Sequence, residues 1–224
     1  MTRPRPRPRR WERRPGERRS EIVTAAVGVF GQAGFRRATL GEIAERAGVC
    51  SGTVSHYFGS KAELFEAVIA ERFVHFVANE EALLAAHRGP ARALLGELLR
   101  RLWSHAWTPG TLELVHVMQV EAFEFEESGR LLFRQLSERW RRLVGSILAK
   151  GIRAGEFRPL EVDLAARTIS YAVMGVAQRV SAVARFDRTL PDREIMWQSL
   201  LGMVERFVLV DPPVEQRIRR PASR

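Results

Sequence analysis

Apolar residues recur along the chain at spacings of three and four, which is the pattern typical of amphipathic helices. The first such stripe comprises Ile22, Ala25, Ala26, Val29 and Phe30, and a glycine follows it at position 34. No strand-like alternation of polar and apolar residues runs for a useful length. The pattern therefore predicts an all-α protein whose first helix covers about residues 17–33.

Two short helices are expected next. Thr39 and Glu42 have the spacing of a capping box, which predicts a helix over 40–47 that ends at Gly48. A second short helix is expected over 51–57. These two helices and the first one predict a small N-terminal unit of three helices.

The rest of the chain is expected to be a larger helical unit. Ser60 and Glu63 repeat the capping-box pattern and predict the start of a longer helix. Later breaks contain proline, which begins helices readily, and glycine, which ends them. They predict helices at about 90–106, 110–126, 129–154, 161–185 and 191–210. About nine helices are therefore expected in all.

Charge is concentrated at the two ends of the chain. The formal net charge is +10, and most of it comes from the Arg-rich segments 1–19 and 215–224. Basic ends on a near-neutral body indicate a polyanionic partner, and an Arg-Pro arm resembles those that lie along a phosphate backbone or in a minor groove. A solvated tail in an Arg-biased protein is the alternative, since Lys61 and Lys150 are the only lysines.

Cellular location is predicted from what the sequence lacks. No apolar run has the length of a membrane-spanning helix, and the Arg- and Pro-rich start holds no apolar stretch for a signal peptide. Cys50 is the single cysteine, so no intramolecular disulfide can form, which fits a reducing compartment. We therefore expect a cytoplasmic protein without a membrane partner.

The two short helices and the segment between them have the spacing of a helix-turn-helix, in which glycine permits the tight turn. The sequence GFRRATLGEIAERAGVCSGTVSHYFGSKAELFEAVI resembles the TetR family of transcriptional regulators. Its matching positions are Gly34, Thr39, Ile43, Ala44, Ala47, Gly48, Val49, Gly52, Thr53, Tyr57, Phe58, Lys61, Glu63 and Leu64. With this resemblance the chain divides into a disordered basic arm (1–16), a DNA-binding domain (17–63), a helical ligand-binding and dimerisation domain (64–210) and a basic tail (211–224).

The resemblance implies DNA contacts from the second short helix and its surroundings. Ser51, Gly52 and Ser55 would face base edges, where hydroxyls form hydrogen bonds and glycine lets the backbone approach closely. Phosphate contacts, which give affinity and register rather than sequence choice, are implied for Thr39, Thr53, His56, Tyr57 and Lys61. Phe58 is expected to be a core aromatic, whereas Tyr57 is expected to pack its ring and point its hydroxyl at a phosphate.

Two positions depart from the common family pattern. Cys50 stands where a serine commonly caps the recognition helix, and because a thiol is a poorer acceptor, Ser51 is expected to take over the cap. Ser55 replaces a common tyrosine, and the string Ser55-His56-Tyr57-Phe58 instead looks like the choline-responsive BetI branch. That similarity covers only the DNA-reading helix and carries no expectation of choline sensing.

An inducer pocket among the middle helices is a further implication of the resemblance. Large or polar side chains could line an apolar cavity and supply a few orienting contacts, although a plain core role is the alternative for most. The candidates are Trp103, Trp107, His116, Phe123, Tyr171, Met174 and Gln178, with His105, Met118 and Phe125 beside them. Glu121 and Arg179 could hold a charged ligand or lie at the surface. The expected effector is an apolar or aromatic small molecule.

A homodimer through the last two helices is also implied. The apolar residues that could form it are Leu164, Ile169, Ala172, Val173, Val176, Ala177, Val180, Leu200, Leu201, Met203, Val204, Phe207 and Val208, although a monomer core could use the same set. One recognition helix spans few base pairs, so paired half-sites favour a two-fold dimer.

The sequence thus predicts a ligand-responsive transcriptional regulator without a cofactor, which represses until an inducer releases it from a palindromic operator. An architectural, sequence-nonspecific DNA-binding protein is one alternative. An enzyme with a DNA-binding appendage is another, supported only by Glu113 and His116 at the i, i+3 spacing of metal-binding helical bundles. The sequence contains no nucleophile elbow, phosphate loop or Cys/His cluster.

Overall fold

The computed structural model describes residues 15–121, 125, 127–184 and 187–209. The predicted basic arm and tail lie almost wholly outside these residues. The N-terminal elements are α1 (Pro15–Arg37), α2 (Leu40–Ala47), α3 (Ser51–Phe58) and α4 (Lys61–Ile69). Both short helices of the predicted helix-turn-helix therefore occur at the expected positions.

The remaining helices form an elongated bundle. α4 continues without a break into the π-helical turn η1 (Ala70–Val74) and α5 (His75–Ala86). They are followed by α6 (Ala91–Ala106), α7 (Thr111–Val120), α8 (Glu127–Arg153), α9 (Val162–Val183) and α10 (Arg193–Val208). With α4, η1 and α5 counted as one rod, the described residues hold nine helices and no strand, so the predicted all-α fold is confirmed.

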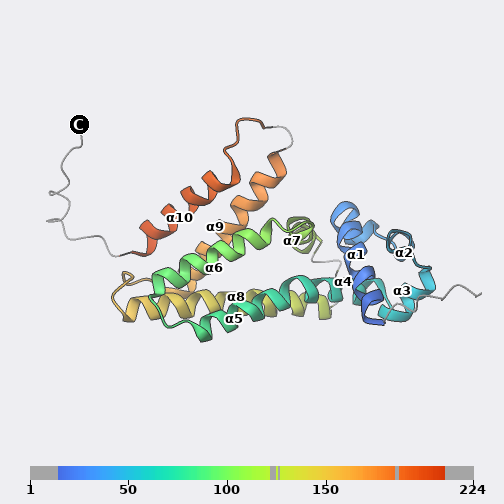
Figure 1. The fold of residues 1–224 in the computed structure, drawn as a ribbon, viewed down its shortest axis with the longest axis horizontal. Helices are drawn as coiled ribbons and strands as arrows, with labels where there is room; N and C mark the ends of the chain where they lie inside the picture. The colour runs from blue at the N-terminus through green and yellow to red at the C-terminus, as the bar shows by residue number, and fades with distance from the viewer. Residues whose placement is uncertain (1–14, 122–124, 126, 185–186, 210–224) are drawn as a thin grey trace, which may run out of the picture.

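The short helices α2 and α3 lie at one end of the molecule, and the last turns of α10 lie toward the other (Figure 1). α5, α6 and α8 run along its length, and α9 and α10 form a flank on the side of α6. α7 lies where the bundle meets α1, with which it shares many close contacts. This position makes α7 a direct connection between the two parts.

The N-terminal core forms because α1, α2, α3 and α4 each bury one apolar face. Phe30 of α1 is fully buried and packs edge-on against Phe65 of α4, with ring centroids 4.9 Å apart. Ile43 of α2 and Val54 of α3 are also fully buried in this cluster. Leu114 of α7 joins the same cluster, so the core of the short helices continues into the larger part of the chain.

A second core fills the bundle among α6, α8, α9 and α10. Leu98, Ile147 and Ile169 are each at most 1% exposed, and each comes from a different helix. Burial of an aliphatic side chain of this size contributes about 1.5–3 kcal/mol. Trp103 of α6 also belongs here and lies against Trp197 of α10, with ring centroids 5.9 Å apart.

The ends of two helices differ from the sequence prediction. α1 was expected to end at residue 33; its first segment does stop at a kink at Gly34, whose φ of 78° and ψ of 169° are not helical, but a further short helical segment continues the element to Arg37. The helix expected over 110–126 ends at Val120, and residues 122–124 and 126 lie outside the described residues. Both differences fall at the junction of α1 and α7.

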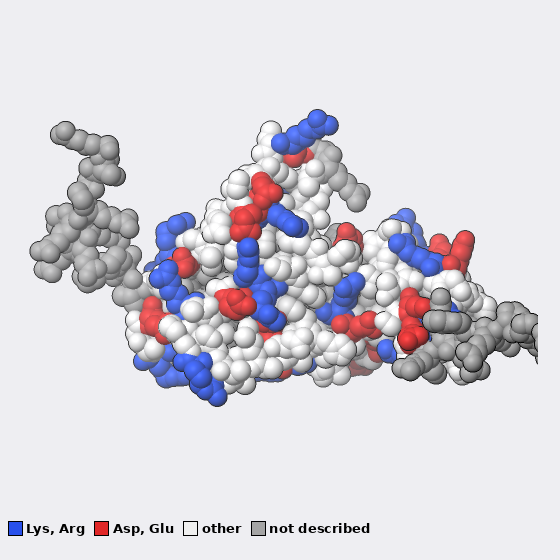
Figure 2. All heavy atoms as spheres, viewed as in Figure 1, with Lys and Arg blue, Asp and Glu red and all other residues white. Residues whose placement is uncertain are grey.

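Basic and acidic side chains are mixed over the visible face, without a large region of one sign (Figure 2). One ion pair has a fully buried member: Glu80 is 1% exposed and its Oε2 accepts a 2.6 Å hydrogen bond from Nε of Arg101.

Among the described residues, no helix combines the length and apolarity needed to cross a membrane.

Candidate DNA-binding surface and ligand cavity

The helix-turn-helix is fixed by its own hydrogen bonds. The Thr39 hydroxyl accepts from the backbone N–H of Glu42 at 3.2 Å, and the Glu42 carboxylate accepts from the backbone N–H of Thr39 at 2.9 Å, which completes the predicted capping box. Gly48 ends α2 with φ 65°, a left-handed conformation that favours glycine. α3 begins three residues later at Ser51.

The outward face of α3 carries short side chains. Ser51, Gly52, Ser55 and His56 are exposed, whereas Val54 is buried, as is Phe58. The exposed four occupy positions i, i+1, i+4 and i+5, which lie on one side of a helix. Hydroxyls and a glycine on this face allow the helix backbone to lie close to the edges of bases.

Cys50, and not Ser51, is the N-cap residue of α3. Cys50 has the extended φ and ψ of −83° and 154°, while Ser51 is already the first helical residue. No side chain caps this end; instead the Cys50 thiol lies 3.1 Å from the Thr53 hydroxyl. The expectation that Ser51 takes over the cap is therefore wrong. The hydrogen bond with Thr53 lowers the pKa of the exposed thiol.

Three of the residues predicted to contact phosphate already have intramolecular partners, namely Thr39, Thr53 and Lys61. The Thr39 hydroxyl donates its proton to Glu42 Oε2 at 2.8 Å, which holds the pKa of the Glu42 carboxyl below its usual range. Lys61 Nζ donates to the carbonyls of Arg36 and Ala38, at 3.2 and 3.0 Å. Because an ammonium has three donors, one N–H of Lys61 is left for a phosphate.

Tyr57 is half-buried, with its ring centroid 5.7 Å from that of His56 and 6.3 Å from that of Phe58.

Arg36 and Arg37 were not among the predicted DNA contacts, yet both are exposed shortly before the capping box. Exposed arginines are common phosphate donors, so both join the candidates for phosphate contact, although Nε of Arg37 already donates to the Ala33 carbonyl at 3.0 Å.

A cavity of about 370 Å³ lies inside the bundle, bounded by η1 and α5 to α9. Its wall is mainly apolar and includes Phe73, Phe76, Leu102, Met118, Phe133 and Trp140. A hollow of this size and character is typical of small-molecule sites. The three phenylalanines and the tryptophan in this wall were not predicted from the sequence, because the helical pattern does not distinguish a cavity wall from a packed core.

Two polar side chains in the wall have no hydrogen-bond partner. Thr111 is fully buried and its Oγ1 is unpartnered, as is Nε2 of His105. The His105 ring stacks on Phe76 with centroids 4.0 Å apart, and burial followed by the charge of Arg72 lowers its pKa to about 4. His105 is therefore neutral at physiological pH, and both groups are available to a polar atom of a ligand.

Only some of the predicted ligand-binding residues line the cavity. Tyr171 and Met174 line it, together with His105 and Met118. Trp103 and Trp107 do not, because their faces of α6 pack toward α10 and toward each other. His116 and Gln178 line a second, more open hollow near Gly31 of α1. Phe123 lies outside the described residues.

α7 is shared between the cavity and the helix-turn-helix unit. Thr111, Val115 and Met118, at positions i, i+4 and i+7, form one wall of the cavity. At the end of α7, the Glu121 carboxylate accepts a 2.8 Å hydrogen bond from the backbone N–H of Arg36. A Cβ at Gly34 would collide with the Glu121 carboxylate, which explains the close approach of the two helices at a glycine.

The metal-dependent alternative receives no support from the part of the chain that the structure describes. Glu113 and His116 lie on α7 as the spacing predicts, and the described residues contain no group of three His, Cys, Asp or Glu side chains placed to hold a metal ion.

Comparison with known proteins agrees with this geometry. Residues 22–68 match the family model of bacterial regulatory proteins of the tetR family, and residues 93–208 match the C-terminal domain of AefR-like transcriptional repressors. The HTH-type transcriptional repressor KstR2 of Mycolicibacterium smegmatis is 27% identical over 161 residues, which are 69% of this chain and 75% of the relative.

Solved structures show the same fold. FadR from Bacillus subtilis, in complex with stearoyl-CoA, has a TM-score of 0.68 and 22% identity, over 83% of this chain and 96% of that one. A transcriptional regulator from Saccharomonospora viridis, in complex with choline, has a TM-score of 0.73 and 20% identity, over 87% of this chain and 99% of that one. The chain therefore belongs to the TetR family and is a ligand-responsive, DNA-binding transcriptional regulator.

Proposed function

We propose that the chain is a repressor that holds a palindromic operator as a homodimer and releases it when a small, largely apolar molecule enters the cavity. The observation that carries this proposal is the double role of α7, which forms a cavity wall through Thr111 and meets the end of α1 through Glu121. A ligand that displaces α7 therefore acts directly on the helix-turn-helix unit.

Operator reading is assigned to the exposed face of α3. Ser51, Gly52 and Ser55 are placed to meet base edges, and His56 and Tyr57 flank them as candidates for phosphate contact. The Thr53 hydroxyl already pairs within the domain, and Lys61 keeps one N–H donor for a phosphate beside its two bonds to backbone carbonyls. Sequence choice then depends on short side chains and backbone fit rather than on long bidentate contacts.

Exposed apolar side chains on α9 and α10 support a dimer through these helices. Leu164 of α9 is 62% exposed, and Ile195 and Met203 of α10 are 61% and 47% exposed. Large exposed apolar side chains on these two helices are candidates for an interaction surface. Of the residues considered from sequence for this interface, seven are instead buried within the protomer: Ile169, Val173, Ala177, Val180, Leu200, Val204 and Val208.

Coupling between cavity and operator follows from two continuous elements. α7 contributes Leu114 to the N-terminal core, and η1 contributes Phe73 to the cavity while continuing directly from α4. A π-helical turn within a helix frequently marks a functional site because its hydrogen-bond register can change. A ligand that favours one arrangement of these elements shifts the spacing of the recognition helices, so operator and ligand oppose each other.

Selection of genomic DNA tests the proposal. Fragments retained by the full chain are sequenced, and the enriched site is compared with a scrambled duplex of equal length in a competition titration. We expect preference for the enriched site by about 10³-fold or more, which is the lower range for specific regulators. Equal affinity for both duplexes would favour the architectural alternative.

A further inference from the structure

The rim of the cavity is positively charged, in contrast to its apolar interior. Arg134, Arg141 and Glu138 of α8 and Arg167 of α9 line this part of the cavity. Three guanidinium groups therefore face one carboxylate there. An apolar hollow with a cationic rim offers complementary surroundings to a molecule that has an apolar body and an acidic end.

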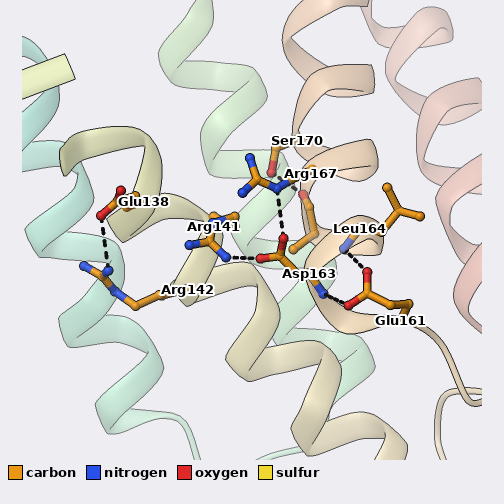
Figure 3. A network of polar contacts seen from close by, with 9 residues as sticks. Glu138, Arg141, Arg142, Glu161, Asp163, Leu164, Arg167 and Ser170 are labelled. Carbon is orange, nitrogen blue, oxygen red and sulfur yellow. Dashed lines mark hydrogen bonds and ion pairs between the residues drawn. The ribbon is translucent and has the colours of Figure 1, made fainter. Parts of the chain in front are cut away.

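Asp163 holds two of these arginines side by side (Figure 3). One carboxylate oxygen accepts from Arg141, and the other accepts from Nε of Arg167 at 2.9 Å. Asp163 is itself held at the start of α9, where its backbone N–H donates to the Glu161 carboxylate at 3.2 Å. One carboxylate between two guanidinium groups leaves a net positive charge.

The arrangement also leaves donors free. A guanidinium has five N–H donors, and each of these arginines has only one atom bonded to Asp163, Nη1 of Arg141 and Nε of Arg167. Because Asp163 restricts both side chains before a ligand arrives, less rotamer freedom is lost when they bind an anion.

Of the two remaining charges at the rim, only that of Arg134 adds to this excess. Glu138 is directed toward Arg142, with Oε2 of Glu138 and Nη1 of Arg142 3.8 Å apart, so its charge is balanced on its own helix (Figure 3). Arg134 is exposed and has no ion-pair partner among the residues that the structure describes. The rim therefore presents unmatched positive charge to the solvent side of the cavity.

We propose, building on the ligand-binding function above, that the effector is an anionic amphiphile whose acidic headgroup is held by Arg134, Arg141 and Arg167. Its apolar body extends along Phe133 and Trp140 into the cavity. A hydrogen-bonding group on that body meets the unpartnered Thr111 hydroxyl. The complexes of related folds with stearoyl-CoA and with choline include an anion and a cation, so the fold alone does not set the sign of the ligand charge.

A cation is disfavoured at this rim for a simple reason. It would approach three guanidinium groups while the nearby carboxylates of Asp163 and Glu138 already have cationic partners. A neutral ligand would bury the same apolar body but leave the free N–H donors of the rim unused. The acidic headgroup is thus the ligand feature that these side chains discriminate.

Two fluorescent probes that share the same aromatic skeleton and differ in charge test the inference on the full chain. 1-Anilinonaphthalene-8-sulfonate carries a sulfonate, and N-phenyl-1-naphthylamine is its neutral counterpart. We expect the sulfonate to bind the unaltered chain about tenfold or more tightly, and Arg134→Gln or Arg167→Gln to remove most of that advantage. Binding of the neutral probe should stay unchanged. Arg153→Gln, at the exposed end of the same helix α8, is the matched control and should alter neither probe.

A variant with a filled cavity distinguishes two outcomes: failure of the anionic-headgroup inference alone, and failure of the proposed ligand-binding function. Met174→Trp adds bulk to a side chain that lines the cavity and should abolish binding of both probes, while circular dichroism confirms that the helices persist. Equal binding of both probes, with no effect of the arginine variants, would overturn the anionic headgroup and leave the cavity as the ligand site. If neither probe bound, or if Met174→Trp left both unaffected, the proposed ligand function of this cavity would fall with the inference.

Discussion

Replacement of Lys61 by methionine separates a structural role from a DNA-binding role. Its Nζ donates to the Arg36 and Ala38 carbonyls, at 3.2 and 3.0 Å, and lies 4.8 Å from the centre of the Phe35 ring. Lys61 therefore connects the start of α4 to the end of α1. Methionine keeps much of the aliphatic length but removes the charge and every donor.

The expected loss of stability follows from these contacts. A hydrogen bond with a charged group contributes about 1.5–3 kcal/mol when protected, and a cation–π contact about 0.5–1 kcal/mol at an exposed site. Lys61 is half-buried, so water can replace part of the hydrogen bonding that its variant loses. We therefore expect Lys61→Met to lose about 2 kcal/mol in the free energy of unfolding, measured in urea. Lys150→Met, which removes one bond to the Gly89 carbonyl at 3.1 Å, should lose about 1 kcal/mol.

The DNA-binding role is measured separately by operator titration at several salt concentrations. The free third donor of Lys61 predicts that its variant lowers the slope of log affinity against log salt by about one for each protomer. The only other lysine, Lys150, lies at the distant end of α8, and its variant should leave that slope unchanged. Unaltered stability of Lys61→Met would refute the connection between α1 and α4, and an unaltered slope would refute the phosphate contact.

Three further predictions concern stability. Cys50→Ser should stabilise the chain by about 0.5–1 kcal/mol in urea unfolding, because the hydroxyl supplies the missing cap of α3; a decrease would contradict the assigned N-cap. Arg101→Met should destabilise by about 1–3 kcal/mol, since it leaves the buried Glu80 carboxylate without its donor, and Arg92→Met on the same helix, which loses an exposed ion pair with Glu205, is the control. The pKa of His105 is lowered from 6.5 to about 4, so the unfolded chain takes up this proton first. Stability should therefore fall by about 2–3 kcal/mol as the pH decreases from 6.5 to 4, and His105→Phe should show less of that decrease; an identical pH profile would refute the buried neutral imidazole.

The helix-turn-helix could be predicted from sequence because its signals are local. The capping box of Thr39 and Glu42, the left-handed Gly48 and the apolar spacing of α3 all act within a few residues of one another. The cap of α3 is the exception. A cysteine and a serine stand next to each other there, and the sequence alone did not reveal which of them leaves the helical conformation.

The ligand cavity could be predicted only in outline because it depends on contacts between distant helices. Trp103 and Trp140 both lie on amphipathic helices, yet Trp103 packs against α10 and Trp140 lines the cavity. Helical periodicity shows that a side chain faces inward but not which neighbour it meets. The same reason explains why Val173 was considered for the dimer and lies in the protomer core.

Footprinting of the enriched genomic site by hydroxyl radicals tests the central claim most directly. The proposed dimer, with one α3 in each of two successive major grooves, predicts two protected patches related by a two-fold axis, with centres about one helical turn apart. Addition of a ligand that occupies the cavity should remove both patches together. Uniform protection without a dyad, or a footprint that persists with the cavity occupied, would contradict the claim that this chain is an operator-reading, ligand-released repressor.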